Sequence, residues 1–122
     1  MLYNNIIDKM KKITKENIKK INELRDLFPG EINVEVHRSE CGEFCAEVTT
    51  FPGCFTEADT FSGLIEMVND AVRTYFEIPK KYLSFMPDYL APIEAAQYFN
   101  MFPVKEGTKN LNLVNANAGA KG

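Results

Sequence analysis

The feature that most constrains the fold of this 122-residue chain is a pair of short segments in which apolar and polar residues alternate, "EINVEVHR" and "EFCAEVTT". The apolar residues at every second position are Ile32, Val34, Val36, Phe44, Ala46 and Val48. Because successive side chains of a strand point to opposite faces, each segment predicts a half-buried strand. Gly42 lies between them, where a turn needs a positive φ. The two segments predict an antiparallel hairpin with one apolar face and one wet face.

The segment "FPGCFTEADTF", residues 51–61, predicts a corner and the start of a helix. Pro52 has no N–H to donate and is excluded from a central strand, so the chain must turn there. Residues 54–56 predict a short third strand, and Thr60 is suited to cap the helix that follows. That helix is expected over residues 61–77, with one apolar stripe against the sheet and its polar residues outward. The residues expected on its outer face are Glu66, Asn69, Asp70 and Arg73.

The two ends of the chain extend this unit. Residues 3–28 carry apolar residues at steps of three and four, which predicts an amphipathic helix that ends before Pro29 and Gly30. The aromatic- and proline-rich residues 79–92 predict an irregular strap that presses three aromatic residues onto the body. These three are Tyr82, Phe85 and Tyr89. A short helix is expected over residues 93–100 after Pro92, and a last strand is possible over residues 109–115.

The predicted fold is therefore α+β, with a small antiparallel sheet of three or four strands in the order β-β-β-α-β and one helix packed on a face. Four regions divide the chain. They are an N-terminal amphipathic helix (1–28), the strand and helix core (31–79), a C-terminal extension (80–115) and a flexible tail (116–122).

The core resembles the HicB family of antitoxins over residues 31–79. The family pattern is an aromatic strand, a Leu/Phe-Pro-Gly-Cys corner and a Thr that opens a helix. The residues that carry it here are Phe44, Ala46, Phe51, Pro52, Gly53, Cys54 and Thr60. The resemblance implies a compact unit similar to a partial RNase H fold that lacks the catalytic carboxylates. It also implies an antitoxin that binds and covers a small basic ribonuclease of the HicA type.

Many members of that family also carry a C-terminal DNA-binding module, and this chain differs from them. Residues 80–122 contain only five Lys and no Arg, too few for a convincing DNA reader. The net charge of −3 also argues against nucleic acid as the main partner. We therefore expect no direct DNA binding by this chain.

Two groups of residues are candidates for binding a partner protein. The first is acidic: Glu31, Glu35, Glu43 and Glu47 alternate outward on the first two predicted strands. Such a face attracts a basic protein, although it is also what an ordinary solvated sheet presents. The second is the strap with Tyr82, Phe85 and Tyr89, whose aromatic residues suit an interface as well as a core. The long first stripe and the sheet edges favour a homodimer.

His37, Cys41, Cys45 and Cys54 have side chains of the zinc-ligand type within eighteen residues, but their spacing departs from paired Cys motifs. A zinc-binding module therefore stays open as an alternative, while no metal or other cofactor is the main expectation. No phosphate loop or paired acid and base is evident, so we expect no enzymatic activity. The odd number of Cys residues and an N-terminus unlike a secretory signal predict a cytoplasmic protein without a membrane segment.

The sequence thus predicts an antitoxin of a type II toxin–antitoxin system that masks a HicA-like, mRNA-cleaving toxin. The alternatives are a stand-alone HicB-like module that binds another protein or a ligand, and the zinc module.

Overall fold

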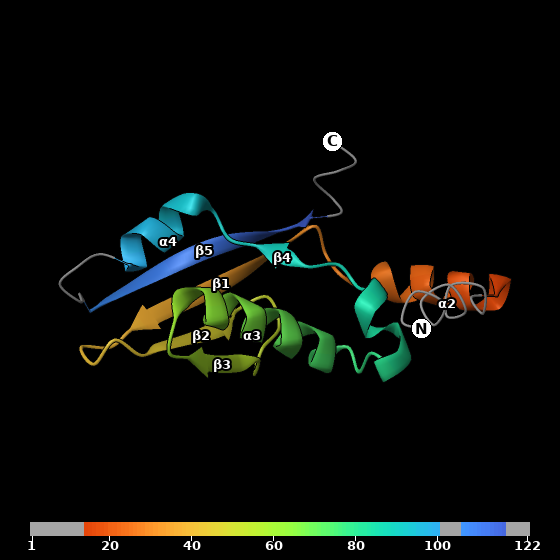
Figure 1. The fold of residues 1–122 in the computed structure, drawn as a ribbon, viewed down its shortest axis with the longest axis horizontal. Coiled ribbons are helices and arrows are strands. Elements are labelled where there is room, and N and C mark those ends of the chain that lie inside the picture. Colours follow the sequence, from red (N-terminus) through yellow and green to blue (C-terminus); the bar gives the residue numbers. More distant parts are fainter. Residues whose placement is uncertain (1–13, 101–105, 117–122) are drawn as a thin grey trace, which may run out of the picture.

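A computed structural model describes residues 14–100 and 106–116, which form a five-stranded antiparallel sheet with helices packed on it (Figure 1). The elements in chain order are α2 (Lys15–Arg25), β1 (Glu31–Arg38), β2 (Phe44–Val48), β3 (Phe55–Ala58), α3 (Phe61–Tyr75), the 3-10 helix η1 (Lys80–Phe85), β4 (Tyr89–Leu90), α4 (Ile93–Phe99) and β5 (Gly107–Asn115). The α+β class is confirmed. The sheet has five strands because β4, in the stretch predicted as an irregular strap, pairs with the end of β5.

The strand order is β3-β2-β1-β5-β4, so the hairpin of β1 and β2 lies inside the sheet, with β3 on one side and β5, followed by β4, on the other. The last strand of the chain lies beside the first one, and its register runs from Glu31 opposite Val114 to Arg38 opposite Gly107. The alternation that predicts β5 is confirmed, because Leu111 and Leu113 are both buried.

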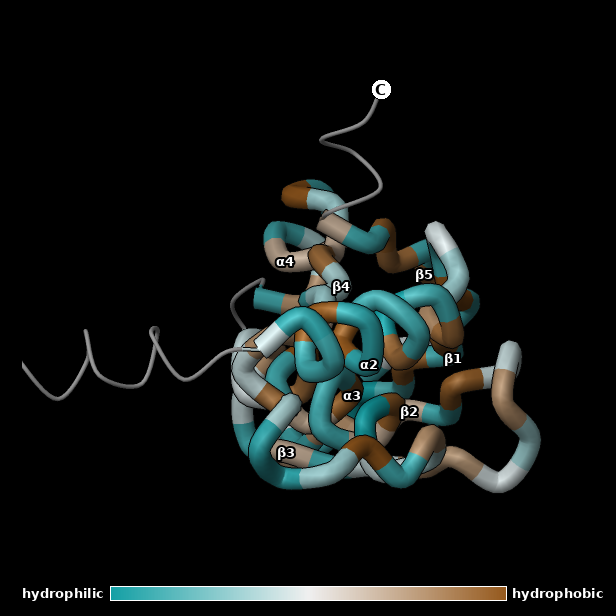
Figure 2. The backbone as a smooth tube through the Cα atoms, turned by 90° about the vertical axis from the view of Figure 1, so that its right-hand side faces the viewer, coloured by the Kyte–Doolittle hydropathy of each residue, from teal (hydrophilic) through white to brown (hydrophobic). Residues whose placement is uncertain are grey.

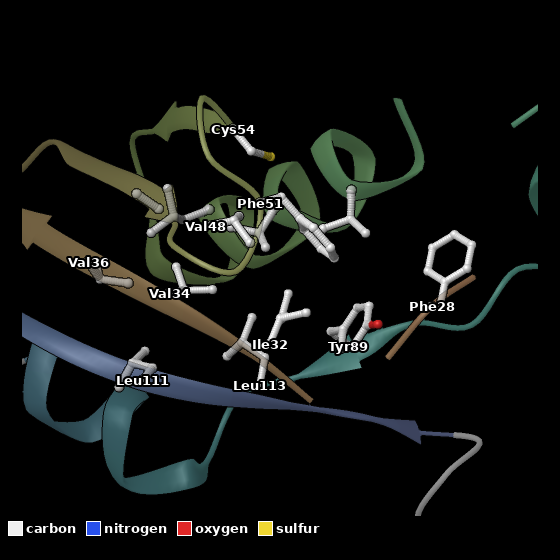
Figure 3. Close-up of a cluster of buried hydrophobic side chains, with 14 of the residues drawn as sticks. Phe28, Ile32, Val34, Val36, Val48, Phe51, Cys54, Tyr89, Leu111 and Leu113 are labelled. Atoms are coloured by element: carbon white, nitrogen blue, oxygen red, sulfur yellow. The ribbon is translucent and has the colours of Figure 1, made fainter. Parts of the chain in front are cut away.

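One face of this sheet is the wall of the hydrophobic core. Ile32, Val34 and Val36 on β1 are at most 1% exposed, and α3 lies over them with the side chains of Leu64, Val68 and Val72 wholly buried. Figure 3 shows side chains from β1, β2 and β5 pointing into one space together with Phe28, Phe51 and Tyr89. The helix stripe and the strand alternation therefore meet as the sequence predicts.

Helix α4 covers the same face farther along the sheet. The ring of Phe99 stacks on that of Phe61, with ring centroids 5.5 Å apart, and forms a T-shaped contact with the ring of Phe44, with centroids 5.6 Å apart. The Arg38 guanidinium donates to the Phe99 carbonyl and lies 4.9 Å above the Phe44 ring. This cluster ties α4 to β1 and β2, so both α3 and α4 lie on one side of the sheet.

The corner between β2 and β3 has the geometry that the sequence predicts. The Phe51 N–H donates to the Val48 carbonyl and the Cys54 N–H to the Phe51 carbonyl, at 3.0 and 3.1 Å. Gly53 adopts a φ of 85°, which favours glycine. Thr60 caps α3, because its side chain accepts from the Gly63 N–H at 3.0 Å.

Helix α2 ends at Arg25, earlier than the predicted Phe28, and residues 3–13 of the predicted helix lie outside the described residues. Ile21 and Leu24 are buried in the core of the same chain, whereas Ile18 and Leu27 are about half exposed. Figure 2, seen from the side where α2 lies, shows most of α2 as hydrophilic. The described part of the apolar stripe is thus covered within the chain only in part.

Asn69 was predicted on the outer face of its helix, and that placement is wrong. It is 8% exposed, and its side chain forms hydrogen bonds with both the N–H and the C=O of Tyr89. The amide nitrogen donates to the Tyr89 carbonyl at 3.1 Å, and the amide oxygen accepts from the Tyr89 N–H at 2.7 Å. Asn69 therefore serves as the hydrogen-bonding partner that the two-residue strand β4 lacks on that side.

No helix in residues 14–100 and 106–116 combines the length and apolar character that crossing a bilayer requires.

Candidate interaction surface

The face of the sheet opposite α3 and α4 carries the acidic residues singled out in the sequence. Along β1 the side chains of Glu31, Asn33 and Glu35 are exposed, in alternation with the buried apolar residues. On β2, Cys45 is exposed and Glu47 is partly exposed, and β3 continues the pattern with Phe55 and Glu57 exposed. We call this surface of β1, β2 and β3 the outer face.

The strand register brings some of the predicted glutamates together and separates others. Glu35 lies directly opposite Glu47 across β1 and β2. Glu31 lies at the other end of β1, beside Val114 of β5. Glu43 precedes β2 and lines a second depression with Glu57 and Asp59.

The pairing of Glu35 with Glu47 places two negative charges on directly opposite residues, an arrangement that destabilises a sheet. One strand further, Glu57 lies opposite Cys45, and Phe55 lies opposite Glu47. The carboxylates of Glu35, Glu47 and Glu57 therefore gather around one point of the outer face. Sequence reasoning missed Glu57 because the third strand was predicted to end at residue 56, before it.

A shallow depression of about 540 Å³ lies at this point of the outer face. Its lining includes these three carboxylates together with His37, Cys45 and Phe55. Phe55 is 67% exposed, which is unusual for a large aromatic side chain in a strand. Exposed aromatic residues beside charged ones are typical of surfaces that bind proteins.

The histidine and the three cysteines are not assembled into a metal site. His37 and Cys45 are directly opposite on β1 and β2, and the Nδ1 atom of His37 lies 2.7 Å from the Thr108 hydroxyl. Cys41 is exposed near the hairpin turn, and Cys54 is buried at the corner, where burial raises the pKa of its thiol. The part of the chain that the structure describes includes all four residues, and it holds no group of three or more His, Cys, Asp or Glu that could bind a metal ion. The zinc alternative therefore lacks its ligand set.

Two aromatic residues of the strap belong to the core. Tyr89 is 1% exposed, and its hydroxyl donates to the Pro29 carbonyl at 2.6 Å. Tyr82 is buried as well, and its hydroxyl donates to the Asn17 side chain at 3.2 Å. Neither side chain offers a surface to a partner in this fold. Their role here is to join α2 and the segment that follows it to the strap.

Phe85 is the member of the strap that keeps exposed surface, at 36%. Its carbonyl accepts from the Arg25 guanidinium at 3.2 Å, which links η1 to the end of α2. Phe85 lies away from the depression described above, because none of the residues that line that depression comes from η1. The two groups of candidate residues therefore do not form one continuous site.

Comparison with known proteins gives one relative. Over 47 residues, which are 38% of this chain, the sequence is 32% identical to a protein of Archaeoglobus fulgidus described as a UPF0150 protein. The matched region covers 68% of that archaeal protein. No family model and no solved structure matches the chain.

Proposed function

The chain belongs to the UPF0150 family, and on that premise we propose that it is the antitoxin of a type II toxin–antitoxin pair. It binds a small, basic, mRNA-cleaving ribonuclease of the HicA type and covers the active site of that toxin. The resemblance of residues 31–79 to HicB antitoxins supports this proposal. The mechanism is steric, since the complex excludes RNA without covalent chemistry. The protein is then a cytoplasmic inhibitor and not an enzyme.

The observation that carries the proposal is the cluster of Glu35, Glu47 and Glu57 around the exposed ring of Phe55. In the free protein these carboxylates repel one another, which costs stability. A cationic partner relieves that repulsion and is attracted from a distance, so it gains association rate as well as affinity. Phe55 supplies the apolar contact that holds the complex once it has formed.

Co-expression tests the proposal. The gene next to this one is examined for a short reading frame that encodes a basic protein with a histidine, and that frame is induced with and without this chain. We expect toxicity alone, restored growth together, and a complex that co-purifies. If the neighbour stays toxic and no complex forms, the proposal fails, and a stand-alone binding module becomes the better interpretation.

A matched pair of variants assigns the effect to the outer face. Glu35→Lys/Glu47→Lys reverses two charges in the depression, whereas Glu23→Lys/Glu94→Lys reverses two exposed charges on α2 and α4. The net charge changes equally in both. We expect the first variant to lose growth rescue and the second to keep it. Equal loss in both variants would show that net charge acts, and not this surface.

We also propose that the protein is a homodimer in solution. Ile18, Leu27 and Leu83 are apolar side chains that remain between 37% and 50% exposed. A second copy that covers them would remove this apolar surface from water. Light scattering of the purified protein tests this proposal, and we expect Ile18→Glu to shift a dimer toward the monomer mass. A monomer at micromolar concentration for the unaltered chain would contradict it.

A further inference from the structure

The edge of the sheet at β3 borders a groove that lies beside the depression on the outer face. The groove lies between β3 and α3, and it contains Met67, Ala71 and Tyr75, which follow one another at steps of four on one face of the helix. Met67 is 43% and Tyr75 is 48% exposed, although both are large and apolar. The groove measures about 400 Å³. Thus α3 buries one apolar stripe in the core and leaves a second, shorter one open along the edge strand.

The backbone of β3 is open at this edge. Among the described strands only β2 pairs with β3, which is the end of the sheet. The Val48 N–H donates to the Cys54 carbonyl at 2.8 Å, so this pair and the next one along, Ala46 with Thr56, are the hydrogen-bonded pairs of the antiparallel ladder. The residues between and beyond them, Phe55 and Glu57, therefore direct their N–H and C=O groups away from β2. A free edge with a neighbouring apolar groove is what an added strand needs.

The charges around this edge indicate what kind of strand it accepts. Glu57 on β3 and Asp59 after it are exposed, and Asp70 lies in the groove itself. Arg73 lies 3.5 Å from Asp70 but is also paired with Asp88. The edge is therefore bordered by more acidic than basic groups and complements a strand rich in Lys and Arg. Phe55 and Thr56 line both this groove and the depression on the outer face, so the two surfaces are continuous.

We propose that the partner ribonuclease docks by adding an extended, basic strand to the free edge of β3. Its backbone pairs with Phe55 and Glu57. Alternate side chains of the strand enter the groove against Met67 and Tyr75, and the others lie over the outer face beside Phe55. This inference rests on the proposed function and specifies how the two proteins meet. Backbone pairing supplies affinity, and the groove and its acidic border select the strand.

Amide hydrogen exchange, measured on the protein alone and in the co-purified complex, tests this docking directly. We expect exchange at Phe55 and Glu57 to slow by about tenfold or more in the complex, because their amides become paired. The amides of Thr108 and Asn110 on β5 serve as an internal reference and are expected to keep their rates. A complex with unchanged exchange at Phe55 and Glu57 would overturn the inference and leave the antitoxin proposal standing. If no complex forms, both fail.

Two substitutions of Glu57 separate what its backbone N–H contributes to binding from what its side-chain charge contributes. Glu57→Gln removes the carboxylate and keeps the N–H, whereas Glu57→Pro removes both, without removing a bond to β2. We expect Glu57→Pro to bind the ribonuclease about tenfold more weakly than Glu57→Gln. Equal affinities would contradict strand addition. If Glu57→Pro fails to fold, the exchange experiment on the unaltered protein still decides.

The groove has its own matched pair of variants. Met67→Lys places a cation in the groove. Ile93→Lys places a cation on α4, outside the groove, where Ile93 is 74% exposed. We expect about tenfold weaker binding for Met67→Lys and little change for Ile93→Lys. Equal binding by both variants would contradict the groove. The β3 amides could instead be protected from exchange in the protein alone, with no further change when the ribonuclease is added. That result would assign the edge to a second copy of this chain and overturn the inference.

Discussion

The two faces of the sheet are built from the same strands and differ in what they do. On β1, Ile32, Val34 and Val36 are closed off by α3, whereas Glu31 and Glu35, at alternate positions of the same strand, are open to water. The inner face holds apolar contacts that stabilise the fold. The outer face holds like charges opposite each other, which do not. Because successive side chains of a strand point to opposite faces, the residues that stabilise the fold and those that we propose bind a partner can be altered separately.

The largest effect on stability is expected from a substitution that opens a cavity between α3 and the inner face of the sheet. Leu64 is wholly buried on α3, and Leu64→Ala should lower the free energy of unfolding by about 3 kcal/mol. Met67→Ala, three residues farther along the same helix, is the control and should change it by less than about 0.5 kcal/mol. Urea denaturation measures both. Similar losses in the two variants would break the distinction between a packed face and an open one.

A smaller effect is expected from the polar contact inside the core. Asn69→Leu keeps the branching at Cγ but leaves the N–H and C=O of Tyr89 without the partner that Asn69 provides, which should cost about 2 kcal/mol. The amide exchange of Tyr89 should accelerate as well, because β4 loses its attachment to α3. An unchanged midpoint of unfolding would show that β4 is held by β5 alone.

Tyr89, on the inner side of the sheet, should make the stability of the fold depend on pH. Burial raises the pKa of its hydroxyl to about 12, and the hydrogen bond with Asn115 lowers it in part. Because the folded pKa is above the unfolded value of 10.0, the stabilisation is complete below pH 10 and is lost as the pH rises toward 12. Unfolding measured from pH 9 to 11.5 should show this decline. Tyr89→Phe should flatten it, and an equal decline in that variant would assign the effect to another group.

The smallest effect on stability is expected on the outer face. Glu35→Gln/Glu47→Gln removes the repulsion across β1 and β2 and should raise the free energy of unfolding by about 0.5 kcal/mol. The same variant should bind the proposed ribonuclease partner more weakly, as measured by calorimetry. A clear loss of stability would mean that these carboxylates hold the fold together, contrary to the separation of the two faces.

Local patterns predicted the parts of this fold that depend on neighbouring residues. Alternation located β1, β2 and β5, and the cap at Thr60 located the start of α3. What local patterns cannot state is which distant segments pair. The position of β5 between β1 and β4 depends on contacts across most of the chain length.

Sequence patterns also predicted some residues of the candidate site and missed others. Alternation placed Glu35 and Glu47 outward, and the register then made them opposite neighbours. Tyr82 and Tyr89 were ambiguous because an aromatic residue suits a core and an interface equally, and the hydroxyl of each finds a partner only in the folded chain. Asn69 was misplaced for a related reason. Its polarity suggests the surface, but its side chain is buried because it accepts a hydrogen bond from the Tyr89 N–H of β4.

The proposed masking of a ribonuclease is tested by titrating that partner with the purified protein while RNA cleavage is followed. Steric masking predicts that cleavage falls linearly and reaches zero at one protein chain for each ribonuclease chain. It also predicts that Glu35→Lys/Glu47→Lys fails to inhibit at the same ratio although it is folded. Full cleavage at an excess of the unaltered protein, or equal inhibition by the charge-reversed variant, would contradict the account.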